Sequence, residues 1–283
     1  MTTRIPAMPY IEFVLDALRA DNELVAHAWS KNLHWGYWAS PESADVSVEG
    51  YCRAMDDLTR RHFLHLDLGP GKRIADVGCG LGGAVSLLNE TFEGLDLVGV
   101  NIDARQLEHA RANVKPRPGS NNRIDFVVAD ACELPFDDAS LDAVLSVECI
   151  FHFSSRDRYL AEIRRVLKPG GRLVVSDFVA RPLRLPLLAL LYLPFHSAVR
   201  GTYGDAAPPP TRGLYRRLAT RNGLELMHVD DVTPNTLPNY QVLPTIVSQL
   251  GEQGAARRAV RFLEYATRLG VYTYDILTFR TRE

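Results

Sequence analysis

The chain has 283 residues, of which 46% are hydrophobic, and its 32 basic and 34 acidic residues leave a formal net charge of −2. This length and apolar content suit one α/β domain with an added cap, or two small domains. Because charges of both signs are mixed along the chain, no basic face indicates nucleic acid, and a small molecule is the expected partner.

The cysteines and the apolar segments indicate a reducing compartment. The four cysteines lie far apart without a CxxC pair, which argues against a zinc site and a disulfide framework: Cys52, Cys79, Cys132 and Cys149. Residues 1–20 make a poor signal peptide because acidic residues interrupt their apolar stretches. The longest apolar run, residues 182–195, is broken by Arg184, Pro186 and Pro194 and falls short of the roughly 20 apolar residues of a membrane span. We expect a cytoplasmic protein without an integral membrane segment or a bound metal.

The first 70 residues predict a helical cap. Residues 9–28 have the apolar spacing of a helix, and residues 48–66 predict a second one, on which His62 and His65 are better explained as solvated side chains than as metal ligands. Between the two, an aromatic segment contains Tyr37 and Trp38. These rings either pack the cap against the core or line a site, where a cationic ligand would gain roughly 0.5–2 kcal/mol from an aromatic face.

Residues 72–88 predict a buried strand, a glycine-rich turn and a helix. The turn contains Gly78, Gly80 and Gly82, and glycine is suited to it because a ligand must approach the bare backbone there. A dinucleotide-binding motif has the same order of elements. Asp76, two residues before the first glycine, distinguishes the two, because a carboxylate repels a pyrophosphate and attracts an ammonium group. An NAD-dependent oxidoreductase is therefore disfavoured.

The run Asp76-Val77-Gly78-Cys79-Gly80-Leu81-Gly82 resembles the first motif of the class I S-adenosylmethionine-dependent methyltransferases, an acidic residue followed by GxGxG. The resemblance implies that S-adenosylmethionine is the cofactor. It also implies that Asp76, Gly78, Cys79 and Gly80 bind it.

Residues 95–100 predict a second strand, which is followed by Asn101 and Ile102. In many class I methyltransferases an acidic residue at this strand end holds the ribose hydroxyls, because a carboxylate accepts two hydrogen bonds. Asn101 stands at that position here, so we expect Asn101 with Gln106 to bind the ribose and Ile102 to lie in the same site. Asp103 is the alternative to Gln106.

Residues 124–129 predict a third strand, followed by Asp130, Ala131 and a Leu-Pro-Phe sequence. This arrangement resembles the adenine site of the family, in which an Asp side chain accepts from the exocyclic amine and a neighbouring backbone N–H meets a ring nitrogen. Asp130 and Ala131 are the expected residues. Alternatively, Asp130 caps a turn.

Residues 141–147 predict a fourth strand, and the segment after it should face the reacting methyl group because ligands gather at the carboxyl ends of strands. Glu148 and His152 follow, one helical turn apart if the segment coils. Both are candidate catalytic bases. Alternatively, Glu148 binds the methionine end of the cofactor or a core donor, and His152 holds the backbone.

The remainder of the chain predicts a helix at 158–167, a turn, a fifth strand at 173–178, and an apolar insert before further helices and two late strands. The insert lies where the family builds its substrate lid, which suggests an apolar acceptor. Packing of a core helix and a dimer face are the alternatives, and a homo-oligomer is compatible with the sequence. A diphosphate acceptor would call for Mg²⁺ and basic anchors such as Arg181, Arg184 and Arg200.

The resemblance implies a Rossmann-like three-layer α/β sandwich with a seven-stranded, mostly parallel sheet. We expect one methyltransferase domain with an N-terminal helical cap (1–70), a cofactor-binding core (71–180), a lid insert (181–222) and a C-terminal part that completes the sheet (223–283). The expected activity is methylation of a small apolar natural product, most often at oxygen. C-methylation of an isoprenoid through a carbocation and a non-catalytic S-adenosylmethionine-binding module are the alternatives.

Overall fold

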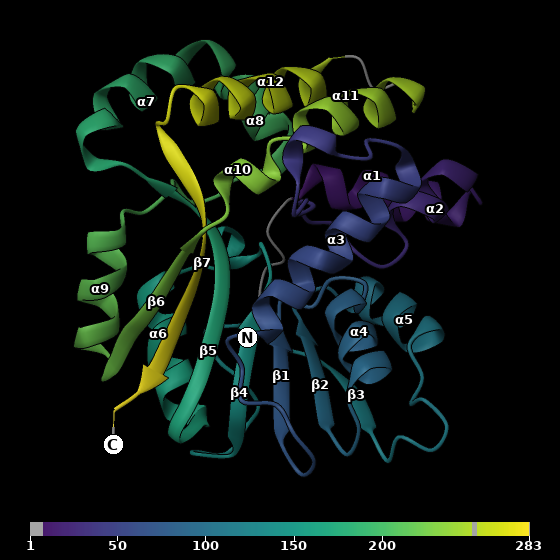
Figure 1. Ribbon diagram of the computed structural model, residues 1–283, viewed down its shortest axis with the longest axis vertical. Coiled ribbons are helices and arrows are strands. Elements are labelled where there is room, and N and C mark those ends of the chain that lie inside the picture. The colour runs from purple at the N-terminus through teal and green to yellow at the C-terminus, as the bar shows by residue number, and fades with distance from the viewer. Residues whose placement is uncertain (1–7, 251–253, 283) are drawn as a thin grey trace.

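The computed structural model describes residues 8–250 and 254–282, which form a seven-stranded sheet in the order β3-β2-β1-β4-β5-β7-β6 (Figure 1). Strand β7 runs antiparallel to both of its neighbours, whereas the pairs among β1 to β5 are parallel. The expected mostly parallel sheet is confirmed. The strands are β1 (Arg73–Val77), β2 (Asp96–Asn101), β3 (Arg123–Val128), β4 (Leu141–Ser146), β5 (Leu167–Ala180), β6 (Leu224–Asp231) and β7 (Tyr272–Thr281).

Helices cover both faces of the sheet, which completes the three layers. Alternate residues of β1 enter opposite cores: Ile74 packs in one cluster, and Ala75 and Val77 pack in the other. The first cluster contains residues of α3 (Val48–Phe63), α4 (Gly83–Thr91) and α5 (Ala104–Asn113), and the second contains residues of α6 (Arg156–Val166) and α9 (Arg212–Arg221).

The remaining helices lie beyond the carboxyl ends of the parallel strands, at the top of Figure 1. Residues 9–28 form two helices instead of one, because Asp21 adopts a positive φ of 50° and the Asn22 side chain caps the second helix. The helices of this layer are α1 (Pro9–Arg19), α2 (Glu23–Trp29), α7 (Leu185–Tyr192), α8 (His196–Tyr203), α10 (Thr233–Thr236), α11 (Asn239–Gln249) and α12 (Ala255–Arg268). Short 3₁₀ turns are η1 (Pro41–Ser43), η2 (Ile150–His152), η3 (Pro182–Arg184) and η4 (Leu193–Phe195).

The expectation that His62 is solvated is wrong, because His62 is fully buried in α3. Its Nδ1 is 2.8 Å from the Leu58 carbonyl, and burial lowers the pKa of the imidazole to about 3. His65 stacks on His228 with ring centroids 5.0 Å apart. Within residues 8–250 and 254–282, no cluster of His, Cys, Asp and Glu is suited to a metal ion. His62 is therefore a packing residue, whereas His65 is half-buried.

The apolar insert is longer and more continuous than its prolines suggest. Pro182–Tyr203 forms 22 helical residues with a mean hydropathy of 1.3, which by length and composition alone is enough to cross a membrane, and only 6% of its most apolar window is buried. The prediction that this run is too short for a membrane span is therefore wrong. Pro186 and Pro194 stand in the first turns of α7 and η4, where proline needs no amide hydrogen and does not interrupt the helical course.

Candidate functional site

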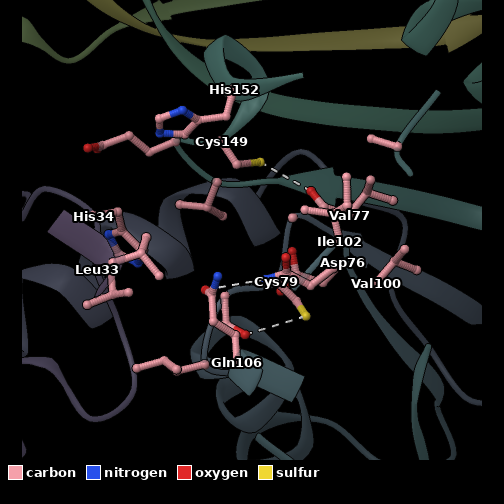
Figure 2. Close-up of a pocket in the computed structure, with 18 of the residues that line it drawn as sticks. Leu33, His34, Asp76, Val77, Cys79, Val100, Ile102, Gln106, Cys149 and His152 are labelled. Carbon is pink, nitrogen blue, oxygen red and sulfur yellow. Dashed lines mark hydrogen bonds between the residues drawn. The ribbon is translucent and has the colours of Figure 1, made fainter. Parts of the chain in front are cut away.

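A cavity opens at the carboxyl ends of β1, β2, β3 and β4. The chain leaves β1 for β2 in one direction, and β4 lies on the other side of β1, so this is the switch point at which open α/β sheets bind ligands. The ends of the strands and helix α1 supply the lining. Figure 2 shows Cys149 and His152 on one side of this first cavity, and Asp76, Cys79 and Gln106 on the other.

The glycine turn brings bare backbone to the cavity. Gly78 and Gly80 both have positive φ, of 86° and 54°, which glycine adopts without strain. A Cβ at Gly78 would lie 2.5 Å from Cys149 Sγ, so any larger residue would displace the loop after β4. Cys79 is buried and lines the cavity between the two glycines.

Asp76 is the buried carboxyl group of the first cavity. Its side chain is 3% exposed, and desolvation raises its pKa from 3.8 to about 7. Burial is the cause of this shift, in contrast to Asp103, whose carboxylate is held by Arg105 at 2.7 Å. A cationic group bound in the cavity would favour the ionised form of Asp76 and lower its pKa again, so the two would stabilise each other.

Asn101, Ile102 and Gln106, the residues expected at the ribose, line the cavity next to the glycine turn. Asn101 Nδ2 donates to Gln106 Oε1 over 3.4 Å, which fixes the two amides together. Asp103, the alternative to Gln106, does not line the cavity. It caps α5 and is bound to Arg105, so its carboxylate is already satisfied.

Asp130 and Ala131 line the same cavity at the end of β3. One oxygen of Asp130 accepts the Cys132 backbone N–H at 2.8 Å, so the turn-capping role proposed for Asp130 is real. This bond fixes the carboxylate at the edge of the cavity. A cap and a ligand contact are compatible, because a carboxylate has further acceptor positions.

Glu148 stands two residues after the end of β4 in a left-handed conformation, with φ of 50°, which is uncommon for a residue with a side chain. Its Oε2 accepts from the Trp35 backbone N–H at 2.9 Å and from the Tyr274 hydroxyl at 2.6 Å. Burial nevertheless raises the pKa of Glu148 to about 8. The carboxyl group is thus oriented through one oxygen, and its pKa lies close to neutral pH.

His152 ends the 3₁₀ turn η2, so it and Glu148 are not on one α-helical face. Its Nε2 is hydrogen-bonded to the Tyr10 hydroxyl at 3.1 Å, and the two rings stack with centroids 5.8 Å apart. Burial lowers the pKa of His152 to about 4, so the imidazole is neutral at pH 7. Tyr10 comes from α1, and nothing in its local sequence pattern distinguished it.

A second cavity adjoins the first, and Tyr10, Leu33 and Glu148 line both. Its wall comes from the cap, the η2 turn, α8, α11 and α12 and is aromatic or aliphatic over most of its area. Glu148 is the residue with a formal charge among the described residues that line it. The other lining side chains include Phe13, Val14, Trp29, Trp35, Tyr51, Phe151, Tyr203, Leu243, Val247 and Val260.

The aromatic segment divides between site and core. Tyr37 and Trp38, which the sequence predicted either to pack the cap or to line the cofactor site, line neither cavity. Trp38 is buried against Tyr51 and donates to the Asp45 carbonyl, and the Arg61 guanidinium lies over the Tyr37 ring. These two rings therefore pack the cap.

Residues just before them reach the cavities instead. His34 lines the first cavity and Trp35 the second. The aromatic composition indicated the segment but not which of its residues face inward.

Comparison with known proteins supports a single family. Residues 75–175 match the family described as "Methyltransferase domain". The chain is 33% identical over 254 residues to "Methyltransferase GfsG" of Streptomyces halstedii, an alignment that covers 83% of this chain and 82% of that protein. It is 36% identical over 218 residues to the 27-O-demethylrifamycin SV methyltransferase of Amycolatopsis mediterranei (strain S699), covering 77% and 75% of the two chains.

A solved structure shows the same fold. Geranyl diphosphate C-methyltransferase from Streptomyces coelicolor A3(2) superposes with a TM-score of 0.74 at 20% identity, over 99% of this chain and 100% of that one. The buried Asp76 carboxyl group, the glycine turn and the polar groups at three strand ends agree with a ligand that carries an ammonium group and a nucleoside. The chain therefore belongs to the class I S-adenosylmethionine-dependent methyltransferases, with S-adenosylmethionine as its cofactor.

Proposed function

We propose that this enzyme O-methylates a hydroxyl group of an uncharged, largely apolar natural product, with Glu148 as the proton acceptor. The observation that carries this proposal is the junction of the two cavities. Glu148 lies where a polar, carboxylate-containing cavity meets an apolar one, and an acceptor hydroxyl there would be within reach of its side chain.

In the proposed complex, the residues of the first cavity hold the cofactor. Asp76 would hold the ammonium group, and the backbone from Gly78 to Gly80 would leave room for the ligand. Asn101, Ile102 and Gln106 would hold the ribose, and Asp130 with the Ala131 N–H would bind the adenine edge. The bound cofactor supplies an electrophilic methyl group on a sulfonium. The protein then contributes alignment, which can be worth roughly 7–11 kcal/mol, and removal of one proton.

Glu148 is the preferred base because its position and its pKa agree. The Tyr274 hydroxyl and the Trp35 amide hold one carboxylate oxygen, so the other is available to the acceptor proton. A pKa of about 8 makes ionised Glu148 a stronger base than an ordinary carboxylate. His152, with a pKa of about 4, is neutral at pH 7 and a weak base. A role in positioning Tyr10 through their hydrogen bond therefore suits it better than a role as the base.

The apolar cavity disfavours a prenyl diphosphate acceptor. Arg181, Arg184 and Arg200, the basic anchors that the sequence offered for a diphosphate, do not line it. Arg184 donates to the Leu269 carbonyl, and Arg200 pairs with Asp205 at 2.7 Å. A diphosphate would therefore have to stay outside the described lining, and we expect no requirement for Mg²⁺.

C-methylation of an alkene is the second candidate, because Trp35, Phe151 and Tyr203 line the second cavity with Glu148. Aromatic faces and a carboxylate stabilise a carbocation. The two reactions differ in what the acceptor must contain. O-methylation needs a free hydroxyl, whereas C-methylation needs a nucleophilic double bond.

The test uses labelled S-adenosylmethionine and a panel of apolar acceptors in matched pairs, one with a free hydroxyl and one with that hydroxyl capped as an ether. Transfer to the free hydroxyl alone supports O-methylation. Transfer to both members of an alkene-containing pair overturns it in favour of C-methylation. Cofactor binding without transfer to any acceptor class would favour the non-catalytic binding module.

A further inference from the structure

The insert carries an exposed apolar surface outside both cavities. In Figure 1, α7 lies at the upper edge of the molecule beside α12. Leu183, Leu190 and Leu193 are 97%, 68% and 72% exposed. Tyr265 and Leu269 of the neighbouring α12 segment are also exposed. We call these five residues the apolar patch.

Arginines surround the apolar patch. Residues 181–203 and 254–270 together contain seven arginines and one glutamate, although the whole chain has a net charge of −2. Arg200 pairs with Asp205 and Arg268 with Glu264, so the basic character of the surface comes from the other five, Arg181, Arg184, Arg257, Arg258 and Arg261. Contacts place several of them next to the patch: Arg184 donates to the Leu269 carbonyl, and Arg258 donates to the Pro194 carbonyl over 3.0 Å. Arg257 and Arg261 lie exposed on the same helix as Arg258.

We propose that this surface docks peripherally on an anionic lipid bilayer, with the apolar patch in the acyl region and the arginines at the phosphates. An apolar helix face flanked by basic residues binds such an interface through apolar burial and electrostatic attraction together. The inference does not depend on which atom of the acceptor is methylated.

The packing of the insert favours docking in the plane of the bilayer over crossing it. The inward side of α7 and η4 packs against α12. The ring centroid of Phe262 lies 5.7 Å from that of Tyr192 and 5.8 Å from that of Phe195. A spanning helix would have to abandon this contact and take Arg184 into the membrane. The bilayer is therefore expected to meet only the outward face.

The charge of the surface also argues against a second copy of the chain. A two-fold interface places the same patch on both partners, so two surfaces of net positive charge would be brought together. A bilayer with anionic headgroups instead complements them. Docking would also place α8, whose Gly201, Thr202 and Tyr203 line the apolar cavity, close to the lipid phase from which an apolar acceptor can partition.

The experiment measures flotation of the full chain with vesicles of phosphatidylcholine, with and without phosphatidylglycerol. The wild type should float with the anionic vesicles and lose this binding at high salt. The double variant Leu190→Asp/Leu193→Asp should abolish it, and its matched control, Leu64→Asp/Met227→Asp, changes two exposed apolar residues elsewhere and should float like the wild type.

Arg257→Glu/Arg261→Glu should weaken partitioning about tenfold or more, whereas Arg216→Glu/Arg217→Glu on α9 should have little effect. Melting curves and S-adenosylhomocysteine binding show whether each variant is folded. Equal loss in patch and control variants, or no flotation of the folded wild type, overturns the proposal. Sedimentation that reveals a dimer dissolved by Leu190→Asp/Leu193→Asp, without vesicle binding, assigns the surface to self-association instead.

Discussion

At the residue scale, the site contains two buried carboxyl groups in different surroundings. Desolvation raises the pKa of both groups. Glu148 also accepts hydrogen bonds from the Tyr274 hydroxyl and the Trp35 backbone N–H. A buried carboxyl group such as Asp76, whose pKa is shifted by desolvation alone, suits a residue that binds a cationic ligand. Desolvation combined with orientation suits a group that exchanges a proton with its ligand.

Asp76→Asn should weaken S-adenosylhomocysteine binding and stabilise the ligand-free protein at neutral to alkaline pH. The pKa of Asp76 is raised on folding from 3.8 to about 7, so the stability that it contributes below pH 3.8 is lost as the pH rises to about 7. The amide avoids this loss. Urea unfolding of the ligand-free protein should show a gain in stability of roughly 1–3 kcal/mol. Calorimetry should show a loss of similar size in the free energy of S-adenosylhomocysteine binding.

Asp142→Asn is the matched control for this prediction. Asp142 accepts from the Arg73 backbone N–H and from Lys168, and its pKa is lowered. Its loss should destabilise the protein at neutral pH and leave cofactor binding unchanged. A destabilising Asp76→Asn substitution above pH 7 would mean that Asp76 has a structural role instead.

The pH dependence distinguishes the two candidate bases. With cofactor saturating, kcat/KM for the acceptor should rise about tenfold per pH unit and level off at or below pH 8, because Glu148 must lose its proton and a bound sulfonium favours its ionised form. Glu148→Gln should remove the rise together with most of kcat. If His152 is the base, the profile will already be level above about pH 5.

At the scale of elements, the turn between β1 and α4 is the feature on which the cofactor site depends. Its backbone conformation is set by glycines, and its distance from the loop after β4 is set by the absence of a side chain at Gly78. The loop after β4 carries Glu148 and His152. The spacing of these two elements therefore couples the cofactor cavity to the proposed base.

Gly78→Ala should destabilise the protein by more than the roughly 1–2 kcal/mol expected for a left-handed alanine, because its Cβ would also meet Cys149. Gly71→Ala provides the comparison, since Gly71 has a similar φ of 81° and a Cβ added there would have nothing within 4 Å. Unfolding in urea and S-adenosylhomocysteine titration check both effects. Equal costs for the two variants would show that the contact with Cys149 is readily relieved.

At the scale of the whole molecule, the cap, the carboxyl ends of the central strands and the insert meet around two adjoining cavities. Tyr10 from α1, Glu148 from the end of β4 and Tyr203 from α8 are separated widely in sequence and line the same apolar cavity. Ligand binding should therefore stabilise the fold as a unit.

S-adenosylhomocysteine at 100 times its dissociation constant should stabilise the protein by about 2.7 kcal/mol, which corresponds to roughly 5–10 °C in Tm for a chain of this size. NADH at the same concentration should leave Tm unchanged, because Asp76 opposes a pyrophosphate. Differential scanning fluorimetry measures both. A shift with NADH and none with S-adenosylhomocysteine would contradict the assignment of the first cavity.

The sequence by itself determined the local features that depend on residues close together in the chain. The glycine turn after a buried strand and the acidic residue ahead of it were visible in the residues themselves. Their resemblance to the methyltransferase motif then implied the three-layer fold and the positions of Asp76, Gly78, Asn101, Gln106 and Asp130, which line the first cavity. Such features are readable because backbone conformation and strand burial are set by a few neighbouring residues.

Only the tertiary structure decided what depends on contacts between distant segments. His62 is buried, and Tyr37 and Trp38 pack the cap outside both cavities. Tyr10 is hydrogen-bonded to His152, and Tyr274 to Glu148, across large distances in sequence. Helical and strand periodicity show that a face is apolar, but they do not show whether that face meets a core, a cavity or an external surface. That choice is made by the packing of whole elements, which also left the outer face of the insert exposed.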